Sequence, residues 1–191
     1  MVEERAAYRE DTAAADPAGL ILLDACGVST AMTRRHARAP RGERACGSVP
    51  GGWRKVTLLG ALGLDGLVAA MTIEAATSAA VFLALLERVL LPELAPVRPG
   101  ATLVMDNLRA HKVEAVRERV EAAGFHLRYL PRHSPDLSPI EPCRSKIKTA
   151  LRAKEARSVA DLDRELPGTL ATITASDARG WFRHCGYAAP N

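Results

Sequence analysis

Long apolar runs, paired cysteines and a secretory leader are all missing from this chain. The longest apolar stretch, residues 79–91, is interrupted by Glu87 and Arg88 and falls short of the ~20 residues that cross a bilayer. The four cysteines form no CxxC pair, which argues against a zinc cluster or disulfide framework and favours a reducing compartment. The first residues, 1–4, are acidic where a secretory signal is basic, so we expect a cytoplasmic protein.

The composition is that of one globular domain with an uneven charge. The chain has 191 residues, of which 48% are hydrophobic and 25% charged, and it contains no internal repeats, so disordered and fibrous classes are excluded. The net charge is only +4, but residues 34–55 carry seven basic side chains against one acid, and residues 128–157 carry eight against three. Such blocks predict a polyanionic partner, and a solvated arginine-rich surface is the alternative.

Periodicity and turn residues predict an α/β fold. Residues 1–19 are interpreted as a flexible lead-in or linker stump, 20–157 as the domain, and 158–191 as a helical tail packed on it. Three consecutive strands followed by alternating helices and strands imply a mixed sheet with helices on both faces. The predicted strands are 20–24, 55–62, 67–73, 101–106 and 126–130, and the predicted helices are 77–91 ending before Pro92, 112–123, one from 139, and two within 158–185.

The helix at 77–91 is apolar on nearly every side. This pattern is typical of a helix covered by other elements, and a dimer contact is the alternative.

Three acids from distant parts of the chain are candidates for metal chemistry. Asp24 and Asp106 each end a predicted strand, and Glu141 lies in the first turn of a predicted helix. Carboxylates are the ligands that Mg²⁺ prefers, and two ions ~3.5–4 Å apart activate a water and stabilise the leaving oxygen in phosphodiester displacement.

Each acid also has a structural interpretation. Asp24 and Asp106 can be polar strand ends that cap turns. Ser138 and Glu141 match a capping box, and Glu141 can pair with Arg144 three residues on. Asp65 is interpreted as a turn residue. Asp136 is interpreted as a weak alternate ligand.

One face of the helix after residue 139 combines an acid with cations. Arg144, Lys148 and Arg152 follow Glu141 by three, seven and eleven residues. Helical periodicity places all four on one side, which suits a metal ligand beside phosphate-binding bases.

Four motifs together resemble the catalytic domain of mariner-like DDE transposases, in the branch of bacterial insertion sequences. Asp106 and Glu141 enclose 34 residues, a spacing characteristic of that branch. The resemblance covers about residues 20–187, and a chance match to all four motifs in order is improbable. The motifs are LLDACG (22–27), RAPRGER (38–44), MDNLRAHK (105–112) and LPRHSPDLSPIE (130–141).

The resemblance implies a ribonuclease H-like fold whose Asp24, Asp106 and Glu141 hold two Mg²⁺ or Mn²⁺ ions. Such a domain cuts double-stranded DNA at transposon ends and joins the freed 3′-hydroxyl to target DNA. Asn107 and His111 would support the site by orienting a carboxylate or meeting a phosphate, although His111 can equally be a helix residue without a role. The residues expected to contact DNA are Arg34, Arg35, Arg38, Arg41, Arg44, Lys55, Arg144, Lys148 and Arg152.

The chain departs from the family pattern at several positions. Ala25 stands where a second acid is common, and Arg144 stands where an aromatic residue packs, preceded by Pro142 and Cys143. The 19 residues before the first strand cannot encode the helix-turn-helix modules of full-length relatives.

These departures leave three hypotheses. The first is the catalytic domain of a split or truncated element, acting as a homodimer or with a separately encoded helix-turn-helix protein. The second is a catalytically silent DNA-binding or dimerisation remnant. The third is another two-metal nuclease of the same fold, such as a junction-cutting enzyme.

Overall fold

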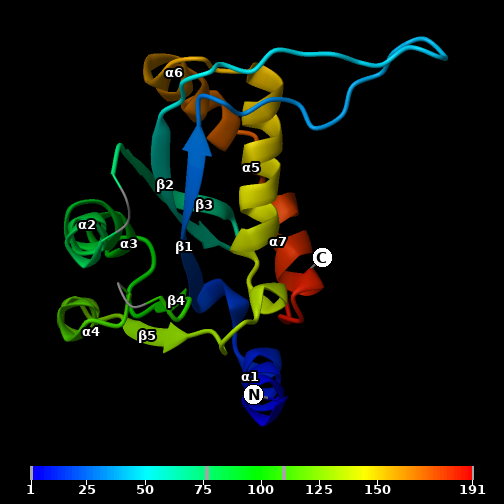
Figure 1. Ribbon diagram of the computed structural model, residues 1–191. Coiled ribbons are helices and arrows are strands. Elements are labelled where there is room, and N and C mark those ends of the chain that lie inside the picture. Colours follow the sequence, from blue (N-terminus) through cyan, green and yellow to red (C-terminus); the bar gives the residue numbers. More distant parts are fainter. Residues whose placement is uncertain (1, 76–77, 109–110, 191) are drawn as a thin grey trace.

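A mixed five-stranded sheet forms the centre of the computed structural model (Figure 1). The strand order is β3-β2-β1-β4-β5: the first three strands form an antiparallel meander, and β4 and β5 run parallel to β1. The strands are β1 (Leu20–Ser29), β2 (Lys55–Gly63), β3 (Gly66–Ile73), β4 (Thr102–Met105) and β5 (His126–Tyr129). The structure describes residues 2–75, 78–108 and 111–190.

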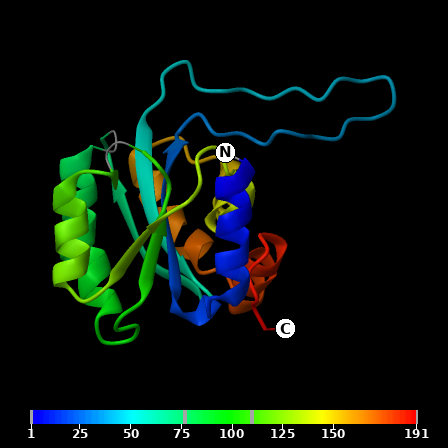
Figure 2. The same ribbon diagram turned by 90° about the horizontal axis from the view of Figure 1, so that it is seen from below.

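Helices cover both faces of the sheet, which confirms the predicted architecture (Figures 1 and 2). One layer contains α2 (Ala79–Leu85), the π-helical turn η2 (Leu86–Leu90), α3 (Leu91–Leu94) and α4 (Glu114–Ala122). The other contains α5 (Ile140–Lys154), α6 (Val159–Leu170) and α7 (Ala175–His184). None of the helices in the described part of the chain is both long and apolar enough to cross a membrane.

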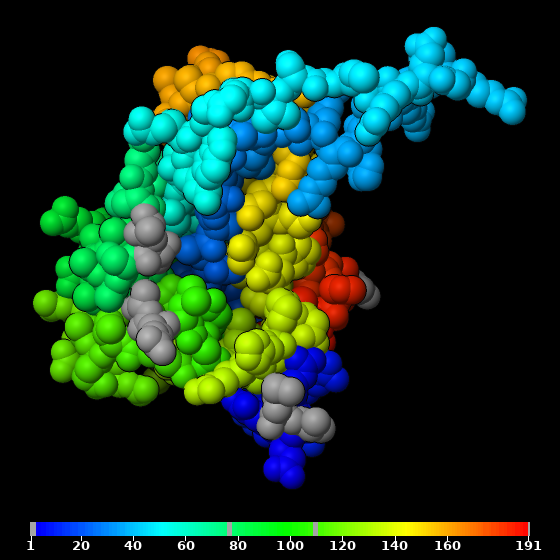
Figure 3. Space-filling view, viewed as in Figure 1, coloured from blue at the N-terminus to red at the C-terminus, as the bar shows by residue number. Residues whose placement is uncertain are grey.

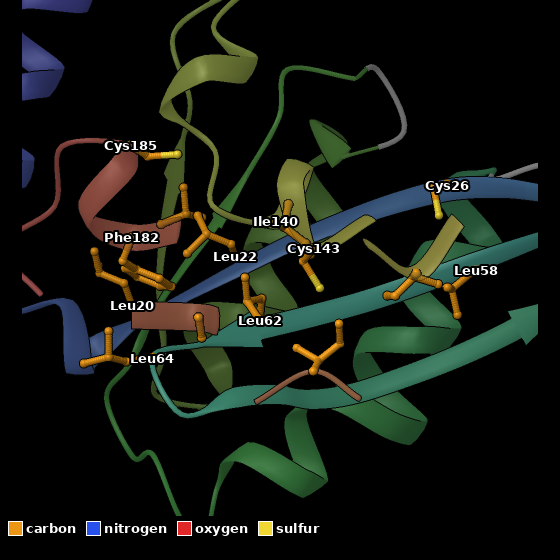
Figure 4. Close-up of a cluster of buried hydrophobic side chains, with 14 of the residues drawn as sticks. Leu20, Leu22, Cys26, Leu58, Leu62, Leu64, Ile140, Cys143, Phe182 and Cys185 are labelled. Atoms are coloured by element: carbon orange, nitrogen blue, oxygen red, sulfur yellow. The ribbon is translucent and has the colours of Figure 1, made fainter. Parts of the chain in front are cut away.

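Two hydrophobic cores lie on opposite faces of β1. Leu20, Leu22 and Cys26 pack toward α5 and α7 (Figure 4). Ile21 and Leu23 pack on the opposite face, toward α2 and α4. This division follows from the two-residue period of a strand, and both faces are apolar because both are covered. By the same period, Asp24 lies on the face of Leu22 and Cys26, toward α5.

The helix predicted at 77–91 belongs to the core, but Pro92 does not end it. Phe82 and Leu86 are fully buried among its neighbours, whereas Thr77 lies outside the described residues. In η2 the amide of Leu91 donates to the carbonyl of Leu86, five residues back, and a new helical turn begins there. Pro92 is therefore in the first turn of α3, where its missing N–H breaks no hydrogen bond.

The N-terminal segment corrects a prediction, because residues 2–14 form helix α1 instead of a flexible lead-in. Tyr8 is buried, and its hydroxyl lies 3.0 Å from that of Tyr187, which donates to the carbonyl of Leu137 (2.9 Å). Arg5 pairs with Asp136 at 2.6 Å. Residues 2–14 have no apolar stripe that would predict a helix, because α1 is anchored by these few contacts.

The segment between β1 and β2 has no regular structure and extends away from the domain as an arm, residues 31–54 (Figure 3). Its glycines and prolines suit an irregular backbone, and it contains most of the basic block of residues 34–55.

Candidate active site

Asp24 lies within β1 and not at its end, which corrects the sequence analysis. The antiparallel pairing with β2 continues past it, with Asp24 opposite Gly60, and carries the strand on to Ser29. The parallel pairing with β4, however, stops at the pair Leu23 and Met105. Asp24 and Asp106 are each the next residue after that pair, so the sheet itself places the two carboxylates side by side.

Asp106 follows β4 as predicted and is held by two donors. Its Oδ1 lies 2.7 Å from Nδ1 of His111 and 3.0 Å from the amide of Leu108. Because an ionised carboxylate only accepts, the imidazole donates through Nδ1. Burial of Asp106 opposes ionisation, but the hydrogen bonds from His111 and Leu108 prevail and lower its pKa.

His111 is fully buried, and its ring lies 4.2 Å from that of Phe82 between centroids. Its Nε2 has no hydrogen-bond partner among the described residues. The geometry agrees with the expected role of orienting a carboxylate. Asn107 instead donates to the carbonyl of Leu130, which ties the end of β4 to the loop after β5.

Glu141 is the second residue of α5, in the first turn as predicted. The capping box does not form, because no side chain caps the start of α5. The amide of Glu141 instead donates to the backbone carbonyl of Ser138 (3.0 Å). Pro142 is the third residue of the helix, where the amide needs no intrahelical acceptor. The side chain of Glu141 is therefore free of a capping role.

Arg144 joins two of the candidate ligands. Its Nη1 donates to Oδ2 of Asp24 and to Oε1 of Glu141, the latter at 3.1 Å. Burial raises the pKa of Asp24, the charge of Arg144 opposes this, and the charges of Glu141 and Asp106 add to the rise. The pairing of Glu141 with Arg144 that the spacing allowed is thus present, and it includes Asp24 as well.

All three acids line one cleft of about 580 Å³ between β1, β4 and the loop before α5. As the side chains lie, the described residues contain no group of three acid, histidine or cysteine side chains arranged to hold a metal ion. In this arrangement Asp24 and Glu141 contact Arg144, and Asp106 contacts His111. Two cations of this cleft were not singled out from the sequence, although both lie within the quoted motifs: Lys112 and Arg132.

A second groove, of about 560 Å³, adjoins the cleft at Glu141 and is strongly basic. Burial and the nearby charge of Arg35 both lower the pKa of Arg152, so cations crowd here without acids to neutralise them all. The predicted face of α5 is confirmed, because its acid and three cations all line the groove: Glu141, Arg144, Lys148 and Arg152. Arg34 and Arg35, at the base of the arm, line it as well.

The remaining basic candidates lie elsewhere. Arg38, Arg41 and Arg44 are exposed along the arm and do not line the groove. Lys55, at the start of β2, lies over the ring of Trp53, with Nζ 4.9 Å from its centroid. None of these four cations lines the groove.

The two acids set aside earlier lie outside the cleft. Asp136 is held by Arg5 and Arg9, and the hydrogen bond from Arg5 lowers its pKa. Asp65 lies in the turn between β2 and β3 and pairs with Arg98. Neither lines the cleft of the three candidate ligands.

The fold is ribonuclease H-like, and it matches solved transposase structures. The Mos1 transposase paired-end complex with left transposon end is 17% identical with a TM-score of 0.78, over 96% of this chain and 56% of that one. The Mos1 transposase catalytic domain with raltegravir and Mg is 18% identical with a TM-score of 0.70, over 96% of this chain and 87% of that one. The chain thus spans little more than half of the Mos1 chain in the paired-end complex.

The family is defined by the sequence match. The profile of the DDE superfamily endonucleases matches residues 19–163, and the chain therefore belongs to this family. No match was found among curated proteins.

Proposed function

We propose that this chain is a transposase catalytic domain of the mariner-like, bacterial insertion-sequence branch, which cleaves DNA at the ends of an element and transfers the strand. The observation that carries the proposal is the convergence of Asp24, Asp106 and Glu141, from three separate segments, in one cleft beside a basic groove. Membership of the endonuclease family supports the same chemistry.

The donor chemistry of the three acids suits a divalent metal, although their side chains as they lie are not arranged to hold one. They supply only hard oxygen donors. Burial is the main cause of the raised pKa of Asp24, and the charges of Glu141 and Asp106 add to it, a repulsion that a bound cation relieves. Bound Mg²⁺ or Mn²⁺, as two ions, would activate the attacking oxygen and stabilise the leaving one. Asp24 and Asp106 would act from adjacent strands and Glu141 from α5, and His111 would keep Asp106 oriented.

The groove is proposed to bind the phosphates of double-stranded DNA. Lys148, Arg152 and Arg35 are crowded cations whose repulsion a polyanion neutralises. The arm cations would extend this contact along the duplex. Cytoplasmic location, a homodimer and a separately encoded helix-turn-helix protein that selects the element ends complete the proposal.

A plasmid-nicking assay with Mg²⁺ or Mn²⁺ tests the function. Asp106→Asn should abolish nicking of supercoiled DNA and cleavage of transposon-end duplexes, because it removes a ligand charge while keeping the side-chain size. Asp65→Asn is the matched control, since it makes the same change at an exposed turn outside the cleft, and should retain activity. Full activity of Asp106→Asn would show that the ligand assignment is wrong.

One observation favours the second hypothesis, a silent DNA-binding remnant. Arg144 already pairs with both Asp24 and Glu141, so these two acids have a cationic partner without a metal. Binding of DNA with no metal-dependent nicking by the wild-type chain would support the remnant, and measurable cleavage would exclude it.

A further inference from the structure

A single nitrogen of Arg144 contacts both Asp24 and Glu141. Arg144 lies one turn after Glu141 on α5 and directs its guanidinium toward β1, where Asp24 lies on the face that packs against α5. Among the described residues, Arg144 forms no ion pair with Asp106, which is held by His111 instead. Arg144 therefore bridges Asp24 and Glu141, and Asp106 is not part of this bridge.

The Asp24 end of this bridge is largely shielded from water, and the Glu141 end is more open. The side chain of Asp24 is 9% exposed, that of Arg144 is 23% exposed and that of Glu141 is 40% exposed. Attraction between charges is stronger in such surroundings than at a surface, where ion pairs contribute little. The contact with Asp24 is thus the stronger of the two.

We propose that Arg144 occupies the position between Asp24 and Glu141 that a divalent cation needs, so that the arginine and the metal compete for these two acids. The inference rests on the proposed role of the acids as metal ligands. The N–H group and a metal ion draw on the same carboxylate lone pairs, and the guanidinium charge repels a divalent cation. Metal binding there therefore favours departure of Arg144, and the chain should bind metal more weakly than its three acids alone would allow.

The structure gives Arg144 a place to move to. The residue also lines the basic groove of about 560 Å³, which is open beside Lys148. Its Nε is buried and has no hydrogen-bond partner among the described residues, a cost that ends when the side chain turns into the groove and is hydrated. When a metal displaces Arg144, the guanidinium moves from a site where its Nε lacks a hydrogen bond to one where water can supply it.

Titration calorimetry with Mn²⁺ in the absence of DNA tests the competition directly. Arg144→Gln removes the competing charge, and we expect it to bind Mn²⁺ at least ~10-fold more tightly than the wild type, which corresponds to about 1.4 kcal/mol. Arg152→Gln makes the same change two turns further along α5, away from the acids, and should bind within ~2-fold of the wild type.

A gain of similar size in both variants would indicate a general charge effect and overturn the proposal. Equal or weaker binding by Arg144→Gln would also overturn it, as would the absence of Mn²⁺ binding in every variant. Thermal melting in metal-free buffer checks the fold. If Arg144→Gln is unfolded, Arg144→Met carries the same test with an apolar chain suited to the half-buried position.

Plasmid nicking separates this inference from the proposed function. Wild-type nicking that is lost in Asp106→Asn, together with unchanged Mn²⁺ affinity in Arg144→Gln, would refute the competition and leave the function standing. Tighter binding by Arg144→Gln without nicking by any variant would support the competition and refute the proposed activity.

Discussion

The hydrogen bond between His111 and Asp106 is expected to control the orientation of a candidate ligand. His111→Phe keeps an aromatic ring against Phe82 but removes the donor that lies 2.7 Å from Oδ1 of Asp106. Among the described residues, the amide of Leu108, 3.0 Å away, is then the only hydrogen-bond donor left to Asp106. Its carboxylate becomes freer to rotate in the cleft.

The magnitude follows from exposure and from the behaviour of similar partners. A hydrogen bond to a charged group contributes about 1.5–3 kcal/mol, but the side chain of Asp106 is 40% exposed and can be rehydrated. We therefore expect a loss of only about 1 kcal/mol in the free energy of unfolding. Removal of a partner that orients a metal ligand costs about 10–100-fold in metal affinity, so Mn²⁺ binding should weaken by about 10-fold or more.

Calorimetric titration with Mn²⁺ and urea denaturation measure the two effects separately. His111→Asn provides the complementary variant, because its amide keeps a donor near the position of Nδ1 while losing the ring. If positioning is the role of His111, Asn should retain more metal affinity than Phe even though it packs less well. The reverse order, or wild-type affinity in His111→Phe, would refute the reasoning.

Three further outcomes are expected. Tyr187→Phe should lower the free energy of unfolding by about 1–2 kcal/mol in urea denaturation, because it leaves buried partners in α1 and before α5 unpaired. Hydrogen bonds from Lys146 and from the start of α7 lower the pKa of Asp177 to about 2, so this acid stabilises the fold above its ordinary pKa of 3.8 and ceases to do so as the pH falls through about 2. Asp177→Asn should therefore cost about 1 kcal/mol at neutral pH and little near pH 2 in thermal melts, and a constant difference would contradict this. Replacing both Lys148 and Arg152 with Gln should reduce the salt dependence of duplex binding by ~2 in log–log slope, measured by fluorescence anisotropy, and an unchanged slope would exclude the groove.

Local pattern predicted the positions of Asp106 and Glu141 because each is determined by its own segment. An apolar run that ends in an acid defines a strand end, and helical periodicity after a proline-rich loop defines the first turn of α5. The same periodicity correctly placed Glu141 on one face with the three cations that line the groove. Asp24 was placed at a strand end because its apolar run stops there, but hydrogen bonding to β2 carries the strand beyond it.

Only the tertiary structure decided how distant segments use their polar groups. The sequence allowed Arg144 to reach DNA or to pair with Glu141, and the approach of α5 to β1 adds Asp24 as its second partner. The docking of α1 depends on Tyr8 meeting Tyr187 across the whole length of the chain, which no local pattern encodes. Periodicity reports which side of an element is buried, whereas the partner of a buried charge is set by what packs against it.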